Sequence, residues 1–218
     1  IFLSETRRMH DDVCGFISDQ IYEGRLKSHV SCRAQGTGAG TGLRWLRADH
    51  EGCSTSSEAE AILVAGEVRR LIGMDWTDQH GETRPLTVDD FMVVAPYNDQ
   101  VHLVRAYLEM DPVTRGVRVG TVDKFQGQQA PVVFFTMTTS PADDMPRGAE
   151  LLFSRNRLNV AISRARCLAY LVCTEELLDS RAHGVEDMRL ISTLCAFVEA
   201  AIEAARYRST TSQRPDET

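Results

Sequence analysis

Four arginines lie within the twelve-residue stretch 155–166, among regularly spaced apolar residues. The spacing predicts a helix whose buried side is formed by Leu158, Ala161, Ile162 and Ala165. Arg157 and Arg164 are seven residues apart, which places them along one border of that side. A pair of guanidinium groups at such a border can reach into a cleft between domains. Two surface salt bridges, which contribute little stability, are the alternative, and the spacing alone does not decide between them.

Two other polar segments follow apolar runs that are typical of buried strands. Residues 96–100 (PYNDQ) follow FMVVA, and residues 120–127 (GTVDKFQG) follow VRV. Because ligand sites in open parallel sheets lie outside the carboxyl ends of the strands, these segments and the start of the arginine-rich helix are candidate site residues. Taken singly, each is better explained as an ordinary turn with a helix cap, and Asn98 is predicted to cap the helix after it. Their occurrence together favours a site.

The elements that must position these residues follow an alternating pattern. Strands are predicted at the runs LRWLRA, FMVVAP, VRVGTV, PVVFFTM and CLAYLVC. Helices are predicted at DDVCGFISDQIY, from a capping box at Ser57 and Glu60 to about Ile72, after Asn98, and over residues 186–205. SCRAQGTGAGTG and GMDWTDQHGETRPLT are predicted loops, and the first lacks the lysine that a phosphate loop requires. The alternation predicts an α/β fold, a parallel sheet covered by helices on both faces.

Length and composition are those of one α/β domain, with 218 residues of which 43% are hydrophobic and 25% charged. A net charge of -7 argues against a protein that coats nucleic acid nonspecifically, although it leaves room for a local basic cleft. The six cysteines form no CxxC pair, and we interpret them as reduced core thiols of a cytoplasmic, intracellular protein. We find no membrane span, signal peptide or metal-ligand set. The start at Ile1 without a methionine indicates a piece of a larger protein.

Three motifs occur in the order found in superfamily 1 helicases. PYNDQ, VGTVDKFQGQQAPVVFF and RNRLNVAISRAR resemble motifs IV, V and VI of that family, near residues 95–100, 119–129 and 157–166. The opening RRMHDDVCGFISDQIYEGRL is similar to the YRMHP…FYEGxL segment of the branch that includes the nonsense-mediated decay helicase and the DNA replication helicase/nuclease. The resemblance implies a RecA-like second helicase domain over residues 1–206, with the P-loop NTPase fold but without the phosphate loop. Composition predicts a disordered tail at residues 207–218.

The resemblance implies that ATP binds between two RecA-like domains. The first domain supplies the phosphate loop and the acidic Mg²⁺ ligands, and the second supplies arginine fingers, for which Arg8 and Arg164 are the candidates. An arginine finger offsets charge on the transferred phosphoryl group and contributes about 10³ to 10⁵ in rate. Further nucleotide-binding positions implied by motifs V and VI are Gln126, Gly127, Gln129 and Arg157.

The same motifs imply contacts with single-stranded or duplex DNA or RNA. Tyr97, Asn98 and Thr121 match positions that hold the backbone of the strand, which hydroxyl and amide groups can do without reading sequence. Asp123 and Lys124 either fix the geometry of motif V or touch the strand. The implied partners are nucleic acid and the first RecA-like domain of the same parent chain. The parent would carry out ATP-driven translocation or unwinding, and the isolated chain would be inactive.

The chain departs from the family pattern at three positions. Arg7 replaces the usual tyrosine, Asp11 replaces the proline of RMHP, and Gln129 replaces the glutamate that typically holds the ribose. A neutral amide can still bond a ribose hydroxyl. The change at Gln129 keeps one alternative open, a RecA-like binding or regulatory module without catalytic activity, which the retained Arg8 and Arg164 oppose.

Two further classes of enzyme fit the residues poorly. An enzyme on a dinucleotide-binding fold needs GxGxxG between its first strand and helix, and this motif is absent. A nuclease needs a metal site, but Asp143 and Asp144 lie in PADDMPRG without a further acidic residue and lysine to complete one. We interpret them as a solvated turn, while a nuclease domain elsewhere in the parent protein stays possible for this branch.

Overall fold

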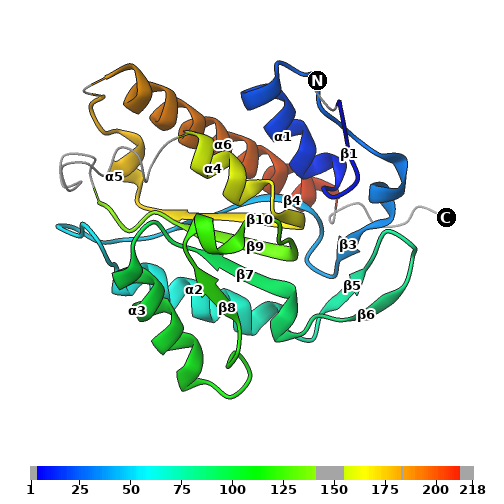
Figure 1. Cartoon of the computed structure of the whole chain (residues 1–218), viewed down its shortest axis with the longest axis horizontal. Helices are drawn as coiled ribbons and strands as arrows, with labels where there is room; N and C mark the ends of the chain where they lie inside the picture. Colours follow the sequence, from blue (N-terminus) through cyan, green and yellow to red (C-terminus); the bar gives the residue numbers. More distant parts are fainter. Residues whose placement is uncertain (1–3, 141–154, 183, 212–218) are drawn as a thin grey trace.

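A computed structural model of the chain describes residues 4–140, 155–182 and 184–211. Its centre is a five-stranded sheet with the strand order β4-β10-β9-β7-β8 (Figure 1). The strands are β4 (Gly42–Arg47), β7 (Phe91–Val94), β8 (Arg118–Gly120), β9 (Ala130–Thr136) and β10 (Ala165–Cys173). All neighbouring pairs run parallel, which confirms the predicted α/β fold.

The three central strands are buried on both faces. Every residue of β7 and β9 is buried, and so are all residues of β10 except Arg166. The valines and phenylalanines of these runs suit this position because β-branched and aromatic side chains pack well on a pleated surface. Phe134 of β9 and Tyr170 of β10 are partners in the register, and their rings stack with centroids 4.5 Å apart. These strands form a rigid base for the loops that leave them.

Helices cover both faces of the sheet (Figure 1). One face carries α1 (Asp11–Tyr22), α4 (Arg155–Ile162) and α6 (Val185–Thr211), and the other carries α2 (Glu58–Leu71) and α3 (Asn98–Met110). Separate apolar clusters fill the two sides. Phe16 of α1 packs edge-on against Phe197 of α6, with ring centroids 5.3 Å apart, and Val64 and Val104 are fully buried on the opposite side. None of the helices in the described ranges combines the length and the hydropathy needed to cross a membrane.

Two segments predicted as loops contain short strands instead. An antiparallel sheet is formed by β3 (Gly36–Thr37), β5 (Asp75–Thr77) and β6 (Thr83–Pro85), while β1 (Glu5–Thr6) pairs in parallel with β2 (Lys27–Ser28). Asp78 shapes the β5–β6 hairpin, because its Oδ1 accepts from the backbone N–H groups of His80 and Glu82 at 2.7 and 3.1 Å. The loop prediction was wrong because strands of two or three residues carry too little apolar alternation to be detected.

Helix ends agree with the prediction at α2 and differ at α6. Ser57 caps α2 by accepting from the N–H of Glu60 at 3.3 Å. The helix α6 continues to Thr211, so residues 207–211 of the predicted disordered tail are helical, and residues 212–218 lie outside the described part. Extending a formed helix costs little per residue, which composition alone does not reveal. The shorter helical turns are η1 (Val30–Ala34), η2 (Val88–Asp90), η3 (Val122–Phe125) and α5 (Glu175–Leu178).

All six cysteines are free, and the buried ones are Cys14, Cys32, Cys167 and Cys173. Burial raises the pKa of Cys14 to about 11 and that of Cys167 to about 12. Since the thiolate is the reactive form, these groups are chemically protected in the folded chain. The prediction of core thiols therefore holds for four of the six positions.

Alkylation of the folded chain at pH 8 is expected to modify Cys53 and Cys195, which are partly accessible, and to spare the four buried cysteines. Iodoacetamide treatment followed by proteolysis and mass spectrometry measures the modified fraction at each position. The same treatment in guanidinium chloride should modify all six. Equal rates at Cys167 and Cys53 in the folded chain would contradict the packing of β10.

Candidate nucleotide and nucleic-acid sites

The arginine-rich segment ends its helix earlier than predicted. The helix α4 stops at Ile162, a turn carries Arg164, and β10 begins at Ala165. The prediction of a helix through Arg166 was wrong because closely spaced apolar residues at the end of a short helix fit a buried strand equally well. Arg157 therefore lies on α4 and Arg164 lies at the amino end of β10, so the two do not share one helical border.

Arg8 lies beside this turn although it belongs to the opening motif. Its Nη1 donates to the carbonyl of Ser163 at 2.9 Å, and its Nε donates to Oε1 of Gln129 at 3.0 Å. The Arg8 carbonyl accepts from Nε2 of Gln35 at 3.0 Å, and Oε1 of Gln35 accepts from Nε of Arg166 at 2.7 Å. These bonds bring the opening motif, motif V and motif VI together at the amino ends of β9 and β10.

Arg8 and Arg164 form a pair of partly buried cations. Burial lowers the pKa of Arg8, and the positive charge of Arg164 lowers it further. The Nε of Arg164 is buried and finds no acceptor within the described ranges. Neither arginine forms an ion pair with a carboxylate of the described residues. Two neighbouring guanidinium groups that the protein leaves unneutralised favour an anionic ligand, because an anion relieves their repulsion.

The other candidates for the nucleotide lie on the turn that leads into β9. Gln126, Gly127 and Gln129 are exposed, and Gly127 has a φ of 77°, a left-handed conformation that glycine adopts without strain. The contact of Gln129 with Arg8 was not predicted from the sequence. A glutamate at this position would place a negative charge beside Arg8, whereas the neutral amide orients the guanidinium and leaves its charge available.

Arg157 and Asp123 form a bridge between motifs VI and V. Nη2 of Arg157 lies 3.2 Å from Oδ2 of Asp123, which links α4 to η3. The Asp123 side chain is 64% exposed, so the pair contributes little stability and mainly fixes the relative position of the two motifs. Lys124 turns toward the edge strand β8, where its Nζ donates to the carbonyl of Val119 at 3.2 Å.

The carboxyl ends of β7 and β8 carry Tyr97, Asn98 and Thr121, whereas the arginine pair lies at the amino ends of β9 and β10. The N–H of Ala95 donates to the carbonyl of Gly120 at 3.1 Å, which holds the loops after β7 and β8 side by side. Tyr97, in extended conformation, is the N-cap of α3, and Asn98 is the exposed first residue of this helix. The prediction that Asn98 caps the helix was therefore wrong. The expected position at the carboxyl ends of strands therefore holds for this group, and it is wrong for Gln126 and Gly127, which lie on the turn before β9.

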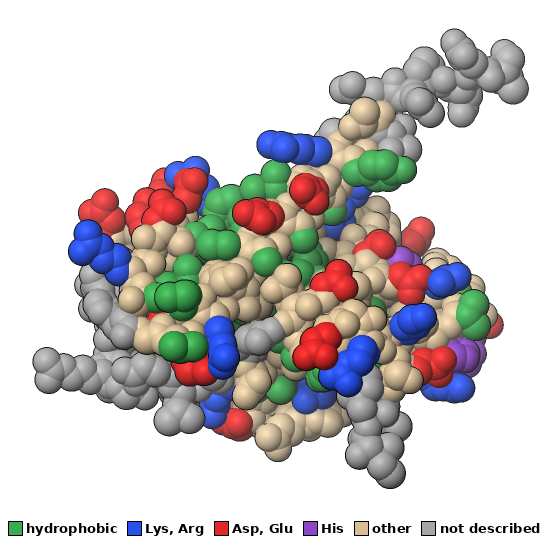
Figure 2. Space-filling view, turned by 90° about the horizontal axis from the view of Figure 1, so that it is seen from above, with side chains coloured by type: hydrophobic (Ala, Val, Ile, Leu, Met, Phe, Trp, Pro, Cys, Tyr) green, Lys and Arg blue, Asp and Glu red, His purple; other side chains and the backbone are tan. Residues whose placement is uncertain are grey.

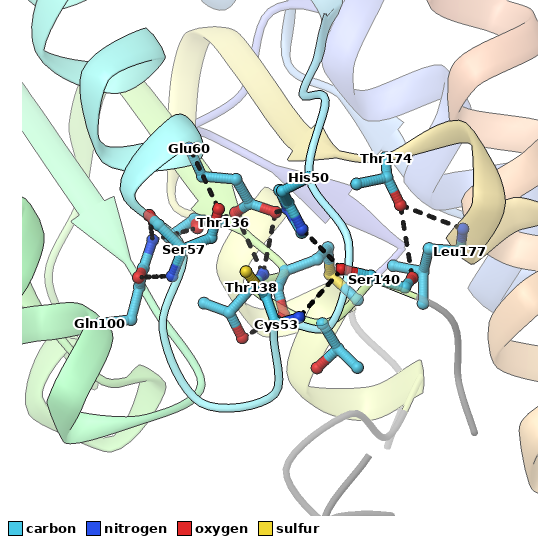
Figure 3. A network of polar contacts seen from close by, with 12 residues as sticks. His50, Cys53, Ser57, Glu60, Gln100, Thr136, Thr138, Ser140, Thr174 and Leu177 are labelled. Carbon is cyan, nitrogen blue, oxygen red and sulfur yellow. Dashed lines mark hydrogen bonds and ion pairs between the residues drawn. The ribbon is translucent and has the colours of Figure 1, made fainter. Parts of the chain in front are cut away.

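A buried polar network at the carboxyl ends of β4 and β9 was missed in the sequence (Figure 3). Glu60 has no exposed surface, and both of its carboxylate oxygens accept from the N–H of Thr138 at 3.0 Å. The hydroxyl of Thr136 also donates to Glu60, and Nε2 of His50 lies 3.1 Å from Oε1. Nδ1 of the same histidine contacts the hydroxyl of Ser140 at 2.7 Å. The Glu60 carboxylate thus links the segments that follow β4 and β9.

Gln100, from motif IV, joins this network to α2. Its Oε1 accepts from the N–H of Ser57 at 2.8 Å, and its Nε2 donates to the hydroxyl of Thr136 at 3.0 Å. The second half of the predicted capping box is therefore wrong, because Gln100 takes the Ser57 N–H and Glu60 turns inward. The spacing of four residues between Glu60 and the buried Val64 is the signal that could have indicated this orientation.

Acidic side chains, with basic ones among them, lie on the face that Figure 2 shows, and the groove between α1 and α6 is lined mainly by acidic residues. An open groove of about 1040 Å³ lies between these helices, and Phe16 and Leu43 are among the apolar residues that line it. The acidic residues that line the groove are Asp11, Asp12, Asp19, Glu199 and Glu203, with Arg208 as the basic one. A surface of this charge repels phosphate, so the face disfavours nucleic acid.

Within the described ranges, no group of three or more His, Cys, Asp and Glu side chains could hold a metal ion. Asp143 and Asp144, which we weighed as a nuclease site, lie outside those ranges.

Comparison with known proteins decides the family. Residues 1–176 match the profile of a family described as AAA domain. The chain belongs to this family. It is 26% identical over 192 residues to the uncharacterized ATP-dependent helicase C05C10.2 of Caenorhabditis elegans, across 78% of this chain and 11% of that protein. It is 26% identical over 194 residues to DNA-binding protein SMUBP-2 of Mesocricetus auratus, across 80% of this chain and 18% of that protein.

A third relative matches more closely over a shorter length. DNA polymerase alpha-associated DNA helicase A of Schizosaccharomyces pombe is 38% identical over 81 residues, across 37% of this chain and 12% of that protein. The AAA domain described here thus spans less than a fifth of the length of these relatives. The match and the helicase relatives confirm a superfamily 1 helicase RecA-like domain of the branch recognised from motifs IV to VI.

Proposed function

We propose that this helicase domain is the second motor domain of an ATP-dependent DNA or RNA helicase or translocase. The observation that carries the proposal is the pair Arg8 and Arg164, two neighbouring guanidinium groups without a carboxylate partner in the described residues. A polyphosphate fits such a pair because it offers several negatively charged oxygens to fork-shaped donors. Since the chain has no phosphate loop, the ATP site is shared with a first RecA-like domain that carries this loop and the Mg²⁺ ligands.

The role of the arginines follows from their positions. ATP, when bound, supplies the phosphoryl group whose transfer to water drives the motor. Arg8 and Arg164 donate N–H groups toward the γ-phosphate and offset the charge that spreads over its oxygens during transfer, an effect of about 10³ to 10⁵ in rate. The Ser163 carbonyl and the Gln129 amide orient Arg8 for this contact. Gln126, Gly127 and Arg157 support the nucleotide or its adjoining loop.

In this proposal the nucleic-acid strand lies at the carboxyl ends of β7 and β8. Asn98 and Thr121 hold its backbone through their amide and hydroxyl groups. The hydroxyl of Tyr97 is buried, so Tyr97 positions the start of α3 beside them, and Asp123 fixes motif V through its ion pair with Arg157. The protein segment from Thr121 to Gln129 connects the carboxyl end of β8 to the amino end of β9. Closure of the two domains around ATP therefore changes the grip on the strand, and alternation between the two states moves the strand through the protein.

A second candidate function is a RecA-like binding or regulatory module without catalytic activity. The observation that favours it is Gln129, which replaces the usual ribose-binding glutamate and is engaged with Arg8. The two candidates differ in one measurable property. A two-domain protein that contains this chain hydrolyses ATP in the first case, and binds nucleic acid without hydrolysis in the second.

The isolated chain is expected to show no ATP hydrolysis, because the phosphate loop and the Mg²⁺ ligands lie on another domain. Phosphate release is measured with and without a single-stranded oligonucleotide, and the two-domain protein serves as the positive control. Turnover by the chain alone, at a rate that scales with its concentration through repurification, contradicts the shared site.

A further inference from the structure

A cavity of about 550 Å³ lies at the free edge of the main sheet, on the outer side of β8. The last turns of α3, the strand β8 and the turn η3 form its walls. The charged side chains that line it are Arg105, Arg118, Lys124 and Glu109. Three cations and one carboxylate give the cavity a positive character on a chain whose net charge is -7.

Two of the cations converge on one backbone atom. Nη2 of Arg105 and Nζ of Lys124 both donate to the carbonyl of Val119, at 3.1 and 3.2 Å. Gly120 allows this arrangement, because a Cβ there would lie 2.5 Å from Cδ of Lys124. A guanidinium and an ammonium group that share one acceptor repel each other, and each keeps N–H donors beyond the one used here.

Arg118 completes the set from β8. Its Nη1 donates to Oε1 of Gln128 at 3.1 Å, and its Nη2 donates to the carbonyl of Asp89 at 2.8 Å, so both acceptors are neutral. Its Nε is buried and finds no acceptor in the described part of the chain. None of the three cations forms an ion pair with a described carboxylate. Buried polar groups are normally satisfied, so the free Nε of Arg118, in a cluster of cations whose charge no carboxylate of the described residues neutralises, indicates an anionic ligand.

We propose that this cavity is a phosphate-binding site, and that the phosphate belongs to the backbone of a nucleic-acid strand. Val119 and Gly120 run directly into Thr121, so a nucleic-acid strand held by Asn98 and Thr121 reaches the cavity by turning around the outer side of β8. Arg and Lys on a backbone phosphate add affinity without sequence preference. The assignment of the phosphate to nucleic acid rests on the proposed function, in which this domain holds a nucleic-acid strand. The existence of the phosphate site does not depend on that function.

A purely structural role predicts different behaviour. The free carbonyls of an edge strand need protection from pairing with other chains, and lysine or arginine side chains commonly provide it. That role requires a hydrogen-bond donor at Val119 but no positive charge. Replacement of Arg105 or Lys124 by glutamine keeps an N–H donor and removes the charge, so these variants separate the two roles.

The test titrates the folded chain with inorganic phosphate and follows its amide resonances by NMR. We expect shifts at Val119, Gly120 and Phe125 in the wild type, and their loss in Arg105→Gln and Arg118→Gln. Arg115→Gln is the matched control, because Arg115 is an exposed arginine of the same segment that does not line the cavity. Circular dichroism confirms that each variant is folded, and Lys124→Gln gives a further variant if Arg118→Gln is not.

Binding of a labelled single-stranded oligonucleotide to the same chains, measured by fluorescence anisotropy against salt concentration, identifies the source. Each charge removed at the cavity is expected to reduce the slope of log affinity against log salt by about 0.7, with no change in the control. Phosphate shifts with an unchanged oligonucleotide slope overturn the nucleic-acid source and leave a site for free phosphate. Absence of phosphate shifts in the wild type overturns the site, even if the motifs bind the strand.

Discussion

Arg164→Ala, in a protein that joins this chain to its first motor domain, is expected to lower nucleic-acid-stimulated ATP turnover by about 10³- to 10⁵-fold. The loss follows because Arg164 lies beside Arg8 without a carboxylate partner in the described residues, so its charge is available to the transferring phosphoryl group. Binding of ATP should change little, since most of the affinity comes from the phosphate loop. Steady-state phosphate release and fluorescent-nucleotide binding measure the two quantities separately.

Two variants sharpen this prediction. Arg164→Lys keeps the positive charge but loses the forked donor geometry, so it should recover only part of the turnover. Arg33→Ala is the matched control, because Arg33 is an exposed arginine whose side chain pairs with Asp11. Unchanged turnover in Arg164→Ala would contradict the assignment of this residue as an arginine finger.

Glu60→Ala is expected to destabilise the fold by about 3 to 5 kcal/mol, the largest effect on stability that we predict. Removal of the buried carboxylate leaves the Thr138 N–H, the Thr136 hydroxyl and His50 without their shared acceptor. Thr138 is also held at a φ of 66°, an uncommon conformation for a β-branched residue, and Glu60 secures it. Urea unfolding followed by circular dichroism gives the free energy of unfolding.

A change of this size can prevent folding, because domains of this length are stable by only about 5 to 15 kcal/mol. Glu60→Gln provides a milder variant, since the amide keeps one acceptor oxygen and presents an N–H group to the Thr138 amide. Glu58→Ala, at an exposed position in the same turn of α2, should cost less than about 1 kcal/mol. If Glu60→Ala costs no more than Glu58→Ala, the network does not hold the strand ends.

The sheet was predictable because its strands are long apolar runs. FMVV and PVVFFT lie in strands buried on both faces, and burial of this kind leaves an uninterrupted hydrophobic signal. The end of α4 was not predictable. Ala161, Ile162 and Ala165 are all buried, yet the first two lie in the helix and the third in β10. Local spacing does not record which side of a helix-to-strand turn an apolar residue occupies.

The site was predictable in its parts and not in its assembly. Motif resemblance named Arg8 and Arg164, but their proximity depends on the fold that brings the first ten residues to the start of β10. The same limit applies to Gln129, whose bond to Arg8 crosses more than a hundred residues of chain. Glu60 was misassigned because a glutamate three residues after a serine fits a helix cap as well as a buried network.

We propose that the arginine pair also accounts for the unusual residue of motif V. A glutamate at position 129 would neutralise part of the charge of Arg8 before a nucleotide binds. Gln129 instead orients Arg8 through a neutral hydrogen bond, so the full positive charge stays available for the phosphate. In this account the substitution moves the role of the position from the ribose to the arginine finger.

The central claim is that Arg8 and Arg164 face the transferred phosphate of an ATP held by another domain. The most direct measurement is a structure of the two-domain protein with ADP and aluminium fluoride, which mimics the phosphoryl group in the transition state of its transfer. We predict guanidinium nitrogens of both arginines at hydrogen-bond distance, about 2.7 to 3.2 Å, from the fluoride ligands. A closed complex in which both side chains point away from the fluoride ligands, with Arg8 still bound only to Gln129 and Ser163, would contradict it.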